Sequence, residues 1–89
     1  MRRYRLTASF YRAAQQHSPA GSPLNNALAD TLAALQDESL PLPGPKDQED
    51  LALPFRRFFT RAVRGTDLVL IYEIAGDVLV IHGVRLASW

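Results

Sequence analysis

Apolar residues in the first 36 positions recur with helical spacing and predict two helices. The first runs from about Ala8 to Gln16 and follows Thr7, whose hydroxyl can accept a hydrogen bond from a free N–H of the first turn. The second begins at Ser22-Pro23, where serine caps the helix and proline gives up an N–H that had no partner. Its apolar face repeats every three or four residues through Leu24, Leu28, Leu32 and Leu35. We expect this face to enter the core.

From Phe55 onward the period changes to two, which is typical of strands. Three strands are expected here, and a short one precedes the first helix. Their ranges are Tyr4–Leu6, Phe55–Val63, Leu68–Ile74 and Val78–Arg85, with glycine-containing turns at Arg64–Asp67 and Ala75–Asp77. The pattern predicts an α+β fold of order β-α-α-β-β-β, in which a small, mostly antiparallel sheet packs on two N-terminal helices.

The segment from Leu40 to Asp50 contains Pro41, Pro43, Pro45 and Gly44. Proline lacks the N–H that helices and central strands need, so we expect an extended connector at about residues 40–50. A chain of 89 residues has room for one hydrophobic core, and we treat residues 1–89 as a single domain.

Cysteine is absent, which excludes a disulfide scaffold, a cysteine-ligated zinc site and a thiol nucleophile. This composition fits a reducing cytoplasm. The longest apolar run, Leu68–Tyr72, is too short to span a membrane, and no apolar segment follows the basic N-terminus as it would in a signal peptide. We therefore expect a cytoplasmic protein with no membrane contact.

The net charge of +1 hides a segregation of charge along the chain. Residues 30–50 carry six acids and one base, a net charge of −5, whereas the remainder carries nine arginines and three acids, a net charge of +6. Guanidinium groups bind phosphate in a planar, bidentate manner. The imbalance favours a polyanion or an acidic protein as partner, although a solvated surface would look the same.

Alternation along Phe55–Val63 separates two sets of side chains. Arg57, Phe59 and Arg61 share one face, and Arg56, Phe58, Thr60 and Arg64 share the other. One face must pack on the helices, and the other would then present arginines beside aromatic rings, which suits phosphates and unpaired bases. The alternative is that the phenylalanines all enter the core while the arginines extend to water.

Two histidines are present. His17 lies in a segment of helix-breaking residues, and His82 lies in the last expected strand, sharing a face with Val78, Val80 and Val84 on period two. His82 is either a hydrogen-bonded structural residue or a catalyst. No metal-binding spacing, GxSxG motif or phosphate-binding glycine loop occurs, so we expect no metal and no cofactor.

Two segments resemble toxins of the RelE/ParE superfamily, from type II toxin–antitoxin systems. Tyr4-Arg5-Leu6-Thr7-Ala8-Ser9-Phe10 resembles the first strand and capped helix of that family. The hairpin from Asp67 to Val80 (DLVLIYEIAGDVLV) resembles the D-W-L-L-I-Y-x-I-x-G-D-x-L stretch of its YafQ-like branch. The resemblance implies the β-α-α-β-β-β fold and an antitoxin that holds the protein inactive.

The resemblance also implies an activity, for which three alternatives stay open. The first is a ribosome-associated endoribonuclease that cleaves mRNA without a metal, with Arg61, Arg85, Asp67 and His82 as catalytic candidates and Arg57, Arg64, Phe59 and Trp89 as RNA-binding candidates. The second is a ParE-like toxin that poisons DNA gyrase, favoured by the loss of basic charge and of both histidines of the YafQ-like branch, whose positions fall at Val63 and near Leu86 or Ala87. The third is a binding module that has lost catalysis.

Overall fold

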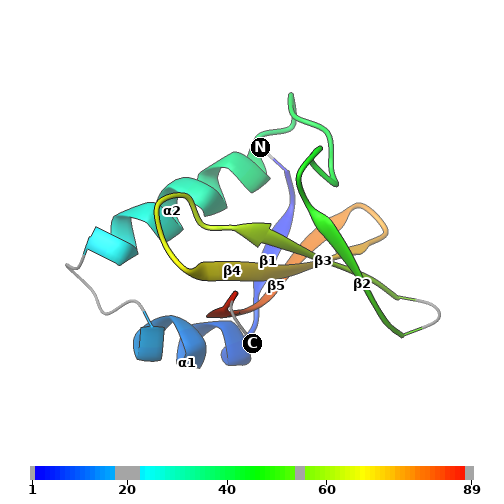
Figure 1. The fold of residues 1–89 in the computed structure, drawn as a ribbon. Coiled ribbons are helices and arrows are strands. Elements are labelled where there is room, and N and C mark those ends of the chain that lie inside the picture. Colours follow the sequence, from blue (N-terminus) through cyan, green and yellow to red (C-terminus); the bar gives the residue numbers. More distant parts are fainter. Residues whose placement is uncertain (1, 18–22, 54–55, 88–89) are drawn as a thin grey trace.

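The structure, a computed structural model, describes residues 2–17, 23–53 and 56–87 (Figure 1). The elements in chain order are β1 (Tyr4–Leu6), α1 (Ala8–His17), α2 (Pro23–Gln36), β2 (Gln48–Leu53), β3 (Arg56–Ala62), β4 (Leu68–Ala75) and β5 (Val78–Leu86). The expected α+β class is confirmed, and His17 ends α1 rather than lying in a loop. Within the described ranges, no helix is both long and apolar enough to cross a membrane.

The five strands form one mixed sheet of order β1-β5-β4-β3-β2. β1 pairs in parallel with β5, and all other neighbours are antiparallel. β2 corrects the sequence analysis, which placed its first residues in the connector and expected no strand there. The last connector proline is Pro45, so the backbone N–H groups from Gln48 onward are free to pair with β3, as in Gln48↔Thr60 and Glu49↔Phe59.

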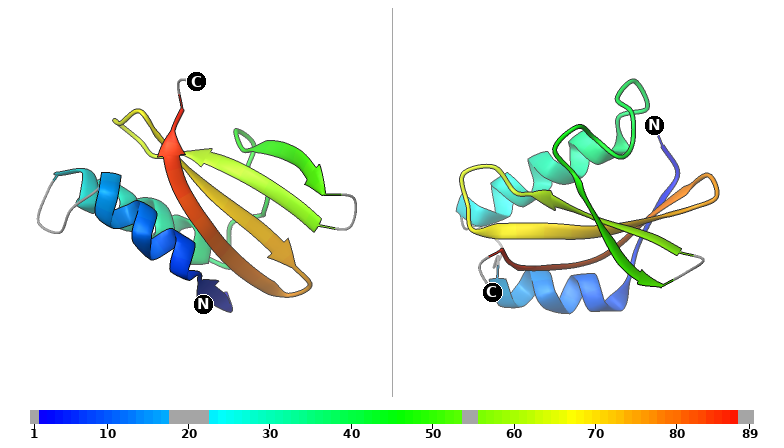
Figure 2. Two further views of the ribbon diagram at one scale, coloured as in Figure 1. Left: turned by 90° about the horizontal axis from the view of Figure 1, so that it is seen from below. Right: turned by 45° about the vertical axis from the view of Figure 1, so that its right-hand side comes forward.

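Both helices lie on the same side of the sheet (Figure 2). Phe10 of α1 and Leu28 and Leu35 of α2 join one core with the inward residues of β3, β4 and β5. The inward set on the sheet is Phe59, Leu68, Leu70, Tyr72, Leu79, Ile81 and Val84. The predicted leucine face of α2 therefore does pack into the core, since Leu28 and Leu35 are buried and Leu32 packs against them. Neither helix covers the opposite side of the sheet, which we call the open face.

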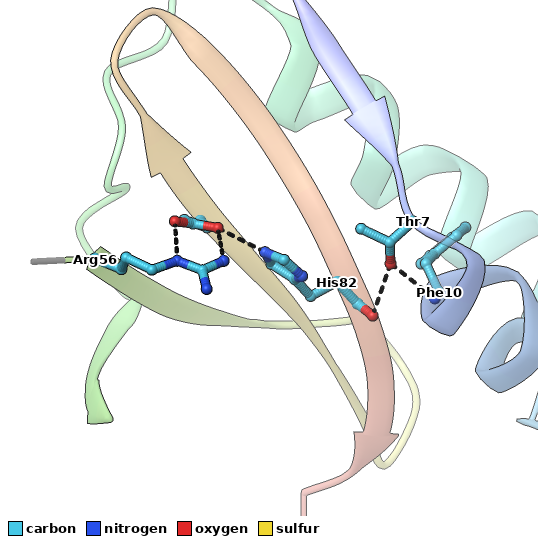
Figure 3. A network of polar contacts seen from close by, with 5 residues as sticks. Thr7, Phe10, Arg56 and His82 are labelled. Carbon is cyan, nitrogen blue, oxygen red and sulfur yellow. Dashed lines mark hydrogen bonds and ion pairs between the residues drawn. The ribbon is translucent and has the colours of Figure 1, made fainter. Parts of the chain in front are cut away.

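Thr7 connects the start of α1 to β5. Its Oγ1 accepts a hydrogen bond from the backbone N–H of Phe10 at 3.1 Å, as expected of an N-cap, and donates to the carbonyl of His82 at 3.3 Å (Figure 3). The backbone N–H of Thr7 also donates to the carbonyl of Ile81 at 3.1 Å. One residue thus ends the β1–β5 pairing and begins the helix that packs along β5.

A β-bulge interrupts the pairing of β4 with β5. Ile71 pairs with Gly83 and Tyr72 with Ile81, so His82 is an extra residue with no partner on β4. The insertion reverses the alternation beyond it: Val84 turns into the core, and Arg85, paired with Val69, turns to the open face. The expectation that Val84 shares a face with His82 is therefore wrong.

Candidate functional site

The open face carries a network of polar side chains in the middle of the sheet. Arg56 and Phe58 come from β3, Glu73 from β4 and His82 from β5. The register places Phe58 opposite Glu73 and Glu73 opposite Val80, and the bulge brings His82 into the same area. Side chains of paired residues point to the same side of a sheet, so these four residues share one surface.

Arg56 and His82 converge on the carboxylate of Glu73 (Figure 3). Arg56 binds it in a bidentate manner, with Nε donating to Oε2 at 2.7 Å and Nη2 to Oε1 at 2.6 Å. Nε2 of His82 lies 2.7 Å from Oε1. The Glu73 side chain is 7% exposed, whereas His82 is 25% and Arg56 47% exposed. The network therefore has a buried anion beneath two groups that reach solvent.

Hydrogen bonds from Arg56 lower the pKa of Glu73 to about 2, against the opposing effect of burial and with a further contribution from His82. Glu73 is consequently ionised at neutral pH and can only accept hydrogen bonds. Nε2 of His82 must then be the donor in this contact. In the neutral imidazole this fixes the tautomer and leaves the lone pair on Nδ1.

Phe58 packs beside the side chains of both Arg56 and His82. The guanidinium carbon of Arg56 lies 4.8 Å from the centre of the Phe58 ring, and the rings of Phe58 and His82 are 5.2 Å apart at 51°. Phe58 is half-buried. It restricts where the Arg56 and His82 side chains can move and leaves part of an aromatic ring on the open face.

Arg5 and Arg85 add positive charge to the open face on either side of the network. Arg5 pairs with Val80, and Arg85 pairs with Val69. In the described part of the chain neither has an acidic partner; Arg85 donates only to the carbonyl of Leu86, at 3.2 Å. Two guanidinium groups thus remain available to an anion beside His82.

The other set of β3 side chains faces the helices, and this overturns part of the predicted site. Phe59 is 2% exposed and stacks on Tyr72 in the core, so it cannot stack on a base. Arg57 lies over the Phe59 ring at 5.0 Å and pairs with Glu49 at 3.2 Å. Arg61 is bound to Asp47 and is not displayed on the open face. The open set is the alternative one, Arg56, Phe58 and Thr60.

Arg61 belongs to a second buried network that holds the connector against the sheet. The Asp47 side chain is 3% exposed and accepts hydrogen bonds from Arg61 Nε at 2.7 Å, Arg61 Nη2 at 2.8 Å, the Gly44 N–H at 2.9 Å and the Tyr72 hydroxyl. Burial raises the pKa of Asp47, but these hydrogen bonds outweigh it and hold the pKa below its usual value. Burial, followed by the hydrogen bond to the Asp47 carboxylate and its charge, raises the pKa of Tyr72, against smaller opposing effects of Arg61 and Gly44. This network is structural.

The remaining predicted residues lie away from the network. Arg64 and Asp67 are exposed in the turn between β3 and β4, where Gly65 has a φ of 77° and the Asp67 carbonyl accepts a hydrogen bond from the Ala87 N–H. Trp89 lies outside the described residues. Of the four catalytic candidates, only Arg85 and His82 share the open face.

Sequence reasoning missed Glu73 and Arg56. A signal was present: Glu73 lies within the apolar strand Leu68–Ala75, and a carboxylate in such a strand requires a charged or hydrogen-bonding partner. What the sequence lacked was the pairing that identifies Arg56 and His82 as those partners.

No group of three or more His, Cys, Asp or Glu side chains suited to hold a metal ion occurs within the ranges that the structure describes. Comparisons with family models, with curated proteins and with solved structures found no match to this chain.

Proposed function

We propose that this protein is the toxin of a type II toxin–antitoxin system and that it cleaves mRNA in the cytoplasm as a metal-independent endoribonuclease. The observation that carries the proposal is the Arg56–Glu73–His82 network on the open face, beside the unpaired Arg85. The resemblance of the first strand and the β4–β5 hairpin to RelE/ParE toxins supports the same class. Compared with the catalytic candidates expected from the sequence, the proposed site includes Glu73 and Arg56 and no longer includes Arg61 and Asp67.

Cleavage of RNA at its own 2′-hydroxyl needs a base near neutral pH and cations around the phosphate. His82 supplies the base: Nδ1 takes the proton, the 2′-oxygen bonds to the neighbouring phosphorus, and the bond from phosphorus to the 5′-oxygen breaks. The departing oxygen takes a proton from water, and the imidazolium returns its own to solvent. The products end in a 2′,3′-cyclic phosphate and a 5′-hydroxyl.

Glu73 is a positioning residue in this scheme. Its pKa of about 2 makes it a poor proton acceptor, but its charge orients the imidazole and stabilises the imidazolium that forms. Arg85 and the solvent-facing part of Arg56 stabilise the charge that builds on the phosphate. Phe58 provides a partly exposed ring for an adjacent base.

A toxin of this kind requires an antitoxin that covers the open face until it is released. Helix-in-groove or added-strand binding would both bring acidic side chains to Arg5, Arg56 and Arg85. We include the antitoxin in the proposal because of the resemblance to RelE/ParE toxins. The ribosome, which presents single-stranded mRNA, is included for the same reason.

The test is cell-free synthesis of the protein, followed by addition to a translation reaction and mapping of the RNA ends. We expect internal cuts with 5′-hydroxyl ends. His82→Gln should reduce the cleavage rate by about 10²–10⁴-fold, because glutamine can still donate to Glu73 but cannot take the proton. His17→Gln, the same substitution at the end of α1 on the covered side of the sheet, is the matched control and should cleave like the parent protein.

Intact RNA in this reaction would refute the nuclease. Growth arrest with intact transcripts and loss of gyrase supercoiling would assign the protein to the ParE-like alternative, and growth without arrest would leave only a binding module. Full activity in His82→Gln would remove His82 from the proposed chemistry while leaving the toxin class in place.

A further inference from the structure

A hollow of about 470 Å³ lies on the open face, at the β1 edge of the sheet. Its lining combines the apolar side chains of Ala75, Val78 and Val80 with Arg3 and, from β1, Tyr4 and Arg5. The volume falls in the range of small-molecule sites, although the hollow is open to solvent rather than enclosed. Apolar side chains beside cationic groups suit a ligand with a flat ring and a phosphate.

Arg5 is the cation of this hollow that has no acidic partner within the described residues. Arg3 makes one contact with Asp77 at 3.2 Å, and the side chains of that pair are 74% and 78% exposed. An ion pair so exposed contributes little and is readily exchanged for another anion. Both guanidinium groups can therefore bind a phosphate without loss of a buried interaction.

The hollow and the Glu73 network lie on one cross-strand row. Arg5 pairs with Val80, Val80 with Glu73 and Glu73 with Phe58. Neighbouring strands are about 4.8 Å apart, so Arg5 is roughly 10 Å from Glu73 along this row. A chain bound at His82 can reach the hollow within a few nucleotides.

We infer that the hollow at the N-terminal strand is a nucleotide subsite, in which Arg5, assisted by Arg3, binds a phosphate of single-stranded RNA that continues from His82. This inference rests on the proposed function for the direction of the RNA. The inference also goes beyond the proposed function, because the subsite lies outside the residues to which catalytic roles are assigned. RNA is favoured over an acidic protein because Ala75 and Val78 offer adjacent small apolar side chains on which a base can lie, beside the buried Val80 and next to a bidentate phosphate donor.

The experiment measures binding of a short 2′-O-methyl oligoribonucleotide to the full chain by fluorescence anisotropy. The methyl groups block the 2′-oxygen, so binding is read without cleavage. We expect Arg5→Gln to weaken binding about tenfold and to reduce the slope of log K against log salt by about 0.7, the value for one phosphate contact on a single strand. Arg12→Gln, at an exposed position of α1, makes the same change of charge and is the control. It should leave the affinity and the salt slope nearly unchanged.

Equal effects of the two substitutions would overturn the subsite and leave the hollow to a protein partner. Failure of the parent protein to bind the oligonucleotide would overturn it as well. The outcome is independent of the cleavage test: Arg5-dependent binding by a protein that leaves RNA intact would support the subsite and refute the nuclease. Circular dichroism of Arg5→Gln should match the parent, since the Arg5 side chain is exposed.

Discussion

Replacing Asp47 with asparagine tests how much of the fold depends on one buried carboxylate. The change keeps the size of the side chain but removes its charge, and the Arg61 guanidinium, 20% exposed, loses the anion that holds it with two hydrogen bonds. Breaking a buried ion pair from one side costs about 3–5 kcal/mol. A domain of this size has a free energy of unfolding of about 4–13 kcal/mol, so Asp47→Asn removes a large fraction of it.

The assay is urea denaturation followed by circular dichroism, with Glu49→Gln as the matched control. Glu49 and Arg57 also join β2 to β3, but through one contact of 3.2 Å between side chains that are 39% and 60% exposed. We expect the control to lose at most about 0.5 kcal/mol. A melting temperature lower by about 15–25 °C should accompany Asp47→Asn, given about 5 °C per kcal/mol for a domain of this length.

The reasoning is refuted if Asp47→Asn loses no more free energy of unfolding than Glu49→Gln. A double-mutant cycle with Arg61→Met locates the cause, because it should show a coupling of about 2–3 kcal/mol between the two residues. A coupling near zero would mean that Asp47 acts only through Gly44 and Tyr72.

Two further predictions concern acid stability and the start of α1. The pKa of Glu73 is about 2 in the folded protein and near 4.5 otherwise, so its stabilising contribution is complete above pH 4.5 and is lost as the pH falls toward 2. Because Arg56 is half-exposed, we expect ionised Glu73 to contribute about 1–2 kcal/mol to the free energy of unfolding. The urea midpoints at pH 7 and pH 3 should therefore differ less in Glu73→Gln than in the parent protein. Equal differences in the two proteins would contradict the pKa argument. Thr7→Ala should lower the free energy of unfolding by about 1 kcal/mol, because the helix loses its cap. Thr7→Ser keeps the hydroxyl and should lose much less in thermal melting. An equal loss in Thr7→Ser would mean that the threonine methyl group, and not the cap, stabilises the protein.

Local patterns were sufficient for most elements. The α2 helix begins at Pro23 and buries the predicted leucine face, because a proline at the first helical position and helical spacing act within a few residues. The expected cap, Ser22, lies outside the described residues. Both expected turns contain a glycine with positive φ, Gly65 at 77° and Gly76 at 64°. The α+β class followed from the change of hydrophobic period at Phe55.

β2 could not be recognised in the same way. Gln48–Leu53 contains two consecutive acidic residues and follows three closely spaced prolines. Both features give the segment only a weak local preference for a strand. It is a strand because β3 offers it an unpaired edge. That reason lies in the sheet and not in the six residues themselves.

The candidate site was half accessible to sequence reasoning. His82 and Arg85 were among the expected residues, but Arg61 and Phe59, also expected, lie on the side of β3 that faces the helices. Alternation divides a strand into two sets without saying which set faces the helices. Here Phe59 stacks on Tyr72 inside, so Phe58 and Arg56 remain outside.

The amino-acid sequence alone determined the elements other than β2 and their order, since these depend on neighbours close along the chain, and it set the number of arginines. Only the tertiary structure decided which arginines are bound by acids and which are free. A single extra residue at His82 reverses every side chain that follows it, and it sends Arg85 outward and Val84 inward. The bulge and the choice of covered face arise from strand pairing and packing between distant segments, and those contacts exist only in the assembled sheet.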